Sequence, residues 1–431
     1  MIAQDESNLP ADFVVRERLK QRPDFTFKHG AARLRWDTPQ LVTVEFDYLR
    51  AENRSGDLKG QVTVTSNAPG SDGLLHRANL NLTSTAGRTA LVKQLASRGK
   101  DQGVDWNALI EDACYLTIDA HRAGEPAVLL RNVERPVDAG WLLPPLVLGR
   151  LPTILFGDGG TAKSYLSLAA AISIHSGQEL LSIKPTAQVN VAYLDFEFDA
   201  WEHRDRMRRL VGEDMPGIVY VKCAGPLRDQ VDRLQRVIRE HGIGFVVIDS
   251  VGMACEGPPE EAQSALGFFD ALRTLNVGAL CVAHVNRSGD TDRPFGSTFW
   301  HNSARSTWYA KKQQEAASST LTVGLFNRKS NTGPLSGPLG FTLAFDDHQT
   351  TIERTDLRDV PELAGNVPLK SRMIRALESG AMNYADLSTT LGVDATALRQ
   401  VVSRSPNLFA RIPGLDGVLQ IGLAAPSRPD V

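Results

Sequence analysis

Apolar and polar side chains alternate along the first part of the chain, up to about Val137. The alternating segments are residues 32–36, 41–46 and 61–65. A period of two predicts antiparallel strands with one solvated face. Two helices are expected after these strands, the second beginning near Asp105. The apolar stripe of that helix would comprise Trp106, Leu109, Ile110, Ala113 and Leu116. The pattern predicts a small α+β domain over residues 1–138.

From about Leu151 the pattern changes to short, continuously apolar segments that alternate with helical periodicity. The apolar segments are residues 153–156, 189–194, 218–221, 245–248 and 279–283. Strands that are apolar throughout are buried on both faces, so they indicate a parallel sheet covered by helices. Two further strands, at a sheet edge, are expected between Leu321 and Phe345. We therefore expect an α/β domain over residues 139–355.

The last part of the chain has a third pattern. Residues 356–369 are predicted to form a linker. Two short helices are expected around Met373 and Leu387, and Asp394 is placed to cap a third that runs to about Arg404. A hairpin around residues 414–417 follows. Three helices and a hairpin are typical of a winged helix-turn-helix, which we expect over residues 370–424.

Composition narrows the class of protein. The 431 residues carry a formal net charge of −3, so no global field favours nucleic acid. No apolar run approaches the ~20 residues that span a bilayer, and the first residues do not resemble a signal peptide. The four cysteines are far apart, which predicts buried thiols and neither a zinc site nor a disulfide framework. We expect a cytoplasmic protein that does not associate with membranes.

The strongest chemical signal is a glycine-rich turn between the segment 153–156 and a helix expected over residues 166–175. Its residues are Gly157, Asp158, Gly159, Gly160, Thr161, Ala162, Lys163 and Ser164, followed by Tyr165. Such a loop lets several backbone N–H groups face one anion at the positive end of a helix. This predicts a phosphate-binding loop (P-loop) for ATP, with Lys163 on the β- and γ-phosphates and Ser164 on Mg²⁺.

Ala162 stands where the P-loop pattern usually has glycine. Alanine is compatible with the loop if its φ angle is negative, as expected for a residue that enters a helix. An ordinary glycine turn, or an inactive P-loop, is the alternative.

Acidic residues follow two of the apolar segments. Asp249 ends the segment 245–248, at the carboxyl edge where ligands bind to parallel sheets, and is expected to hold Mg²⁺ through water. Asp195 and Glu197 end an earlier segment, and strand alternation would place them on the same face. Glu197 is the expected general base that accepts a proton from water, and Asp195 is the alternative candidate for this role. A solvated strand end is the alternative for both.

His284 ends the segment 279–283 and is a candidate sensor of the γ-phosphate, although a structural histidine fits equally well. The polar stretch 286–293 after it is expected to be a loop that faces DNA, with residues 257–261 as a second such loop. The charged residues of the stretch 286–293 are Arg287, Asp290, Asp292 and Arg293. The two arginines favour DNA, but the two aspartates offset them.

Together these motifs resemble the RecA-like ATPases of the RepA hexameric replicative helicase type, over residues 142–345. The resemblance is carried by the P-loop, Leu194-Asp-Phe-Glu197, Ile248-Asp249-Ser250, the turn at His284 and the stretch Phe295-Gly-Ser297. It implies that Glu197 activates water and that His284 couples the γ-phosphate to the DNA-facing loop.

The resemblance also implies a basic finger that reaches the ATP of a neighbouring subunit, and an arginine that stacks on adenine. The finger candidates are Arg305, expected on a helix, and Arg328 and Lys329, expected in a turn over residues 326–331. The stacking candidates are Arg204 and Arg208.

The leading hypothesis is an Mg²⁺-dependent ATPase coupled to DNA, a replicative helicase or helicase-loading motor. It would be a homo-oligomer, favouring a hexamer, with single-stranded DNA in its ring. The alternative is a nucleotide-switched regulatory or defence ATPase that binds a protein partner without unwinding DNA. The third C-terminal helix, with Thr396, Arg399, Gln400, Ser403 and Arg404 facing outward, would contact duplex DNA or a protein.

Overall fold

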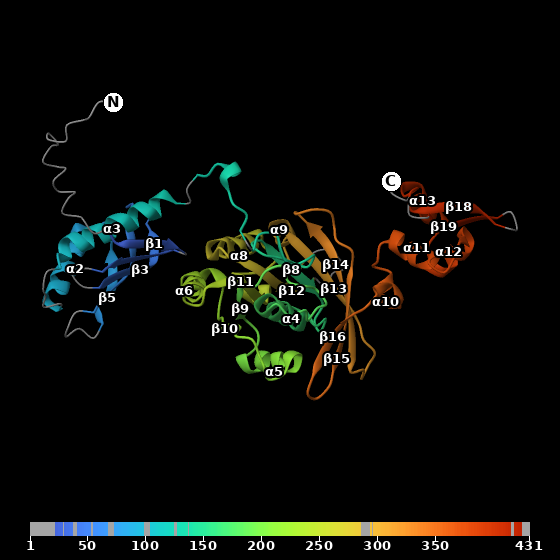
Figure 1. Ribbon diagram of the computed structural model, residues 1–431, viewed down its shortest axis with the longest axis horizontal. Helices are drawn as coiled ribbons and strands as arrows, with labels where there is room; N and C mark the ends of the chain where they lie inside the picture. Colours follow the sequence, from blue (N-terminus) through green and yellow to red (C-terminus); the bar gives the residue numbers. More distant parts are fainter. Residues whose placement is uncertain are drawn as a thin grey trace, which may run out of the picture. The chain divides into compact units, whose positions relative to one another are not determined.

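The computed structural model describes most of the chain, which folds into two compact units (Figure 1). The described residues are 22–28, 30–37, 41–52, 55–67, 73–98, 104–124, 127–136, 138–285, 294, 296–414 and 418–424. One unit comprises the described residues up to Arg135 together with Val231–Glu240, which lie in helix α6 (Val231–His241). The other comprises Pro136–Gln230 and the described residues from His241 onwards.

The first unit contains an antiparallel sheet whose strands follow each other in chain order. They are β1 (Asp24–Lys28), β2 (Ala31–Trp36), β3 (Val42–Ala51), β4 (Leu58–Ser66) and β5 (Leu74–Asn81). Helices α2 (Thr85–Arg98) and α3 (Trp106–Ala123) share an apolar core with this sheet. The Asp105 carboxylate caps α3 by accepting from the Ala108 N–H at 3.0 Å. The small α+β domain is therefore present, with β1 and β5 in addition to the expected strands.

The second unit is built on a nine-stranded sheet. Six neighbouring strands are parallel, in the order β10 (Val219–Lys222), β9 (Asn190–Asp195), β11 (Ile243–Asp249), β12 (Gly278–Ala283), β8 (Pro152–Gly157) and β13 (Ser306–Gln313). The antiparallel strands β14 (Thr320–Ser330), β15 (Leu339–Phe345) and β16 (Thr350–Arg354) extend it. The predicted α/β core is thus confirmed.

Helices connect these strands. They are α4 (Lys163–Ser176), α5 (Ala200–Val211), α6, α7 (Val251–Ala254), α8 (Ala262–Leu275) and α9 (Thr298–Ser303), with a 3-10 turn η2 at Leu227–Gln230. The run Leu166–Ile174 of α4 is buried, as its alanine-rich, apolar sequence requires. A 3-10 turn η1 (Leu130–Asn132) and the short pair β6 (Trp141–Leu143) and β7 (Val147–Leu148) precede the sheet.

Two expectations about the later strands were wrong. Arg305 was expected on a helix, but α9 ends at Ser303 and Arg305 directly precedes the strand β13. The segment 326–331 was expected as a turn, but Arg328 and Lys329 lie within β14. Strand β13 was not predicted because its apolar run is short: Trp308–Ala310 lies between the polar Ser306 and Thr307 and the polar residues 311–313.

The C-terminal part contains the expected helices α11 (Leu369–Leu377), α12 (Tyr384–Leu391) and α13 (Ala395–Arg404). A small sheet of order β17-β19-β18 joins Met382–Asn383, Leu419–Leu423 and Phe409–Pro413. Asp394 caps α13 by accepting from the Thr396 N–H, as predicted. The segment 356–369 is not an extended linker, because it forms η3 (Leu357–Asp359) and α10 (Pro361–Ala364) and buries Leu357, Leu363 and Val367.

The cysteines Cys114, Cys223, Cys255 and Cys281 are free and buried, as expected. Among the described residues, no helix is both long and apolar enough to cross a membrane.

Candidate nucleotide site

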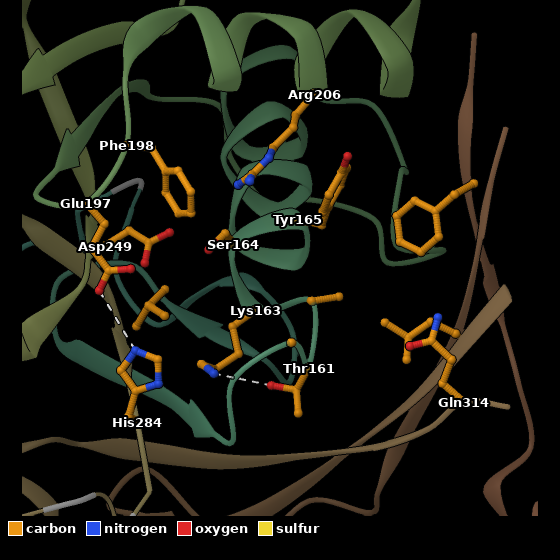
Figure 2. Close-up of a pocket in the computed structure, with 15 residues that line it drawn as sticks. Thr161, Lys163, Ser164, Tyr165, Glu197, Phe198, Arg206, Asp249, His284 and Gln314 are labelled. Atoms are coloured by element: carbon orange, nitrogen blue, oxygen red, sulfur yellow. Dashed lines mark hydrogen bonds and ion pairs between the residues drawn. The ribbon is translucent and has the colours of Figure 1, made fainter. Parts of the chain in front are cut away.

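A pocket of about 380 Å³ lies at the edge of the sheet where β8, β11 and β12 end (Figure 2). It is lined by Gly160, Thr161, Ala162, Lys163, Ser164, Tyr165, Glu197, Phe198, Arg206, Asp249, Val282, His284, Gln314, Leu321 and Phe345. The parallel strands bring the P-loop, Asp249 and His284 together, because their carboxyl ends meet at one edge, whereas Arg206, Leu321 and Phe345 come from α5, β14 and β15. The predicted P-loop, Asp249, Glu197 and His284 therefore share one cavity of a size typical for small-molecule ligands.

The Lys163 ammonium lies inside the P-loop, with its side chain buried. It donates to the Gly157 carbonyl at 2.9 Å, the Asp158 carbonyl at 2.7 Å and the Thr161 hydroxyl at 3.2 Å. Burial lowers the pKa of Lys163 to about 8, although Asp249, Asp158 and Glu197 act in the opposite direction. Its partners are mostly neutral carbonyls, so an incoming phosphate would give this cation a stronger, charged acceptor.

Glycine is required at two P-loop positions. A Cβ atom on Gly157 would lie 2.4 Å from the Ala310 carbonyl oxygen of the neighbouring strand β13. Gly160 has a φ of +70°, and its Cβ would approach the Lys312 ammonium at 3.2 Å. These two glycines allow the loop to curl beside β13 without displacing it.

The expectation of a negative φ at Ala162 was wrong. Ala162 has φ +55° and ψ +23°, in the left-handed region, where it precedes the first turn of α4. This conformation explains why a P-loop usually has glycine at this position, since an L-residue with a Cβ is strained there by ~1–2 kcal/mol. The loop adopts the P-loop shape despite the alanine.

Asp249 is almost fully buried and faces the start of α4. Its carboxylate accepts from the Tyr193 hydroxyl at 2.8 Å and is hydrogen-bonded by the Ser164 hydroxyl. Burial raises the pKa of Asp249 above its ordinary value, and these two hydroxyls partly offset that effect. Tyr193, which the sequence did not single out, holds the carboxylate in place from the neighbouring strand β9.

Ser164 and Asp249 fit a magnesium ion, because a hydroxyl and a carboxylate are the oxygen donors that Mg²⁺ prefers. Among the described residues, no group of three or more His, Cys, Asp or Glu side chains is placed to hold a metal. A site with few protein ligands suits Mg²⁺, which keeps several waters and shares the phosphates of a bound nucleotide.

Asp195 and Glu197 do not share a face, contrary to the prediction from strand alternation. Strand β9 ends at Asp195, and the chain bends immediately after it. Asp195 is completely buried and lies outside the pocket lining, whereas the side chain of Glu197 is 31% exposed and lines the pocket. The bend therefore separates two carboxylates that a regular strand would have placed together.

Glu197 contacts two groups at the phosphate end of the pocket. Its Oε1 accepts from the Ser250 hydroxyl and lies 3.8 Å from His284 Nε2. The His284 contact lowers the pKa of Glu197, with burial opposing and Ser250 assisting. The carboxylate is therefore ionised at neutral pH, as a general base must be before it accepts a proton.

Aromatic side chains form the opposite end of the pocket. The Arg206 guanidinium lies 5.2 Å from the ring centre of Tyr165 and 4.7 Å from that of Phe198, and Figure 2 shows it between them. The Tyr165 ring also packs edge-on against Phe345 at 5.4 Å. Leu321 completes an apolar surface on which a planar base can lie.

Neither Arg204 nor Arg208, the two residues predicted to stack on adenine, lines the pocket. Arg204 is exposed, and Arg208 pairs with Asp205 at 3.1 Å. The guanidinium in the pocket belongs to Arg206. Helical periodicity could have indicated Arg206. Residues 203, 206, 207 and 210 lie on one face of α5, and the other three, His203, Met207 and Leu210, are buried or partly buried.

The three finger candidates have different surroundings. Lys329 donates to the carbonyls of His301, Asn302 and Ala304 at 2.7–2.8 Å, where it caps the end of α9. Arg328 lies over the ring of Tyr309 at 5.5 Å and is half-buried. Arg305 is exposed at the start of β13. None of the three lines the pocket of its own chain.

The predicted DNA-facing loop 286–293 lies outside the described residues. The second predicted loop, residues 257–261, contacts α9. The Pro259 carbonyl accepts from the Ser297 N–H at 2.9 Å and from the Trp300 indole N–H at 2.8 Å. The structure thus connects this loop to the segment that precedes Arg305.

Comparisons with known proteins found one family match and similar solved structures. Residues 124–290 match the model of a family described as an AAA domain. No curated protein matches the chain. Among solved structures, a KaiC-like protein from the hyperthermophilic archaeon Pyrococcus horikoshii OT3 is 15% identical with a TM-score of 0.35, over 51% of this chain and 99% of that chain. The matched residues include the P-loop, Glu197, Asp249 and His284.

Proposed function

We propose that this protein hydrolyses ATP in the pocket between the P-loop and Glu197, and that hydrolysis is coupled to DNA. The observation that carries the proposal is the convergence of Lys163, Ser164, Asp249, Glu197 and His284 on one cavity. A cation, a metal-binding pair and an ionised general base are the parts that phosphoryl transfer to water needs.

The proposed mechanism assigns a step to each side chain. Lys163 leaves the P-loop carbonyls and neutralises charge on the β- and γ-phosphates. Ser164 and Asp249 would hold Mg²⁺, which supplies charge neutralisation at the phosphate oxygens. Glu197 accepts a proton from the attacking water. His284 lies 3.8 Å from Glu197, so it is placed to respond when that carboxylate contacts water or γ-phosphate.

Catalysis would be completed by a basic residue from a second copy of the chain. Among the described residues, the pocket lining offers Lys163 alone as a cation for the γ-phosphate, since Arg206 lies at the aromatic end. Arg305 is the best candidate, because it is exposed, whereas Lys329 caps α9 and Arg328 packs on aromatic rings. A finger supplied in trans is worth roughly 10³-fold or more in rate. We propose a ring-shaped homo-oligomer, with a hexamer favoured.

ATPase assays with single-stranded DNA test the coupling. Stimulation of the wild-type rate by single-stranded DNA, absent in Lys163→Ala, is the expected result. Mixing Lys163→Ala with Arg305→Ala chains should restore some activity, because one kind of mixed interface has both halves intact. Hydrolysis that is indifferent to DNA would remove the motor role, and failure of rescue would argue that one chain is sufficient for catalysis.

The C-terminal part, from residue 370 onwards, favours a second candidate, a nucleotide-switched ATPase that binds a protein partner. Its hairpin exposes Leu408, Ile412, Val418, Leu419 and Leu423. A DNA-binding wing is normally basic, and residues 370–431 contain only seven basic against five acidic side chains. Salt-dependent duplex binding that is lost when residues 370–431 are removed would favour DNA and exclude this alternative.

A further inference from the structure

We propose that the buried carboxylate of Asp195 is a positioning residue that holds Glu197 in its catalytic place. The inference rests on the proposed ATPase function and deepens it. In this proposal Asp195 is not the general base itself but supports the residue that is.

Asp195 binds the turn that carries Glu197. Its Oδ1 accepts from the backbone N–H groups of Glu197 and Phe198, both at 3.0 Å. These bonds span two and three residues, so they fix the bend that follows β9. The bend directs the Glu197 side chain into the pocket and places the Phe198 ring against Arg206.

The other oxygen of Asp195 is fixed from the opposite side. Oδ2 accepts from the Tyr220 hydroxyl at 2.8 Å and lies 3.2 Å from Nε2 of the buried His203. The His203 ring in turn packs against the Tyr193 ring at a tilt of 44°, with ring centres 4.4 Å apart, and Tyr193 donates to Asp249. A continuous set of buried polar side chains thus joins the turn of Glu197 to the proposed magnesium ligand.

These contacts are incompatible with a role for Asp195 in proton transfer. The side chain is completely buried, accepts three hydrogen bonds and has His203 Nε2 3.2 Å away. Burial by itself would raise the pKa of Asp195, but the contacts with His203, the two N–H groups and Tyr220 outweigh it and keep the carboxyl ionised. A permanently charged acceptor gives stronger hydrogen bonds than a neutral one, which suits a fixed support.

Three variants separate positioning from general structure. Asp195→Ala removes every acceptor, so we expect kcat to fall by about tenfold or more through misplacement of Glu197, with KM changed less than about threefold. Asp195→Asn retains one oxygen for the two N–H groups and should recover most of the rate. Tyr220→Phe removes a single donor, keeps the ring and should lower kcat only by about two- to fivefold.

A double-mutant cycle shows whether Asp195 acts through Glu197. Asp195→Ala should hardly change the residual rate of Glu197→Gln, because the base that it positions is already absent. An equal fold-loss in the wild-type and Glu197→Gln backgrounds would overturn the proposal. If Asp195→Ala does not fold, the same cycle is run with Tyr220→Phe.

Amide hydrogen exchange tests the positioning independently of catalysis. The Glu197 and Phe198 amides should exchange at least about tenfold faster in Asp195→Ala than in wild type, and Tyr220→Phe should give a smaller change in the same direction. Unchanged exchange at both amides would overturn the proposal. If wild type shows no Lys163-dependent hydrolysis, the proposed function fails, while the exchange rates still report whether Asp195 holds the turn.

Discussion

The two ends of the pocket are built in different ways. At the phosphate end, Lys163 and Asp249 are buried and held by hydrogen bonds from their own loop and from neighbouring strands. At the aromatic end, the side chain of Arg206 is 12% exposed, lies against the Tyr165 and Phe198 rings and pairs with Glu202 at 3.0 Å. Polar contacts within the loop and from neighbouring strands therefore hold the groups that act on phosphate, whereas ring contacts and one ion pair shape the surface proposed for the base.

The same contrast predicts unequal consequences of substitution. Charges in a buried, hydrogen-bonded environment interact strongly, so their loss is costly. Stacking of a base on a guanidinium contributes less, on the order of 1 kcal/mol. Variants at the two ends should therefore differ in the size of their effect and in the part of the nucleotide that they affect.

Lys163→Ala should have the largest effect on binding. Removing the cation leaves the phosphates without their buried partner, so the Kd for ATP should rise on the order of a hundredfold. Titration with a fluorescent ATP analogue measures this, and Lys222→Ala, which removes an exposed lysine paired with Asp199, is the matched control. Similar affinities for the two variants would show that the P-loop does not bind phosphate.

Affinity at the phosphate end should also depend on pH. The pKa of Lys163 is lowered to about 8 by burial, and bound phosphates favour its charged form. Below pH 8 the ammonium is already protonated and binding takes up no proton at this site. Above pH 8 a proton must be taken up, so the Kd should rise by about tenfold per pH unit until the pKa of the complex is reached.

Calorimetric titration between about pH 7.5 and 9.5, a range that brackets the lowered pKa, measures this dependence. Lys163→Arg, whose guanidinium stays charged over this range, should bind with a nearly constant Kd. A wild-type Kd that stays constant over the same range would contradict the assignment of the titration to Lys163.

Arg206→Ala should have a smaller effect at the aromatic end. The Kd for ATP should rise by about five- to twentyfold through loss of stacking, while the Kd for tripolyphosphate, which has no base, should not change. Arg204→Ala removes an exposed arginine of the same helix and should bind ATP as wild type does. If Arg204→Ala has the larger effect, the assignment of the base to this end of the pocket is wrong.

Ala162→Gly should give the smallest effect, and it should be stabilising. Relief of the left-handed strain exceeds the extra entropy of the unfolded chain, so the free energy of unfolding should rise by about 0.5–1 kcal/mol. Ala170→Gly, in the interior of α4, should instead lower it by about 1 kcal/mol. Urea denaturation measures both, and destabilisation by Ala162→Gly would contradict the φ angle in this structure.

The difference between the two ends also explains what the sequence could predict. Gly157, Lys163, Asp249 and His284 belong to short motifs at the ends of apolar strands, and parallel strands bring their ends together without further information. The aromatic end draws on residues from Tyr165 to Phe345, and their proximity depends on how α5, β14 and β15 pack. Of these residues, Arg206 alone could have been placed in the pocket from a local pattern, the helical periodicity of α5.

The backbone conformation at two positions of the site could not be predicted from the sequence either. The sequence shows that residue 162 is alanine, but it does not show the positive φ angle of this residue, because the conformation of the whole P-loop imposes it. It contains Asp195 and Glu197 with a spacing of two, but the bend that separates them depends on hydrogen bonds from Tyr220 and from the turn itself. Alternation rules fail where a strand ends, which is also where parallel sheets place their functional residues.

The most direct test of the central claim is a single-turnover experiment on Glu197→Gln. The amide has the size of the carboxylate but cannot accept the proton, so the variant should retain bound ATP and hydrolyse it at least roughly 10³-fold more slowly than wild type. ATP recovered intact from the isolated complex, with a Kd close to that of wild type, is the predicted result. Hydrolysis at the wild-type rate would contradict the assignment of Glu197 as the general base and the account built on it.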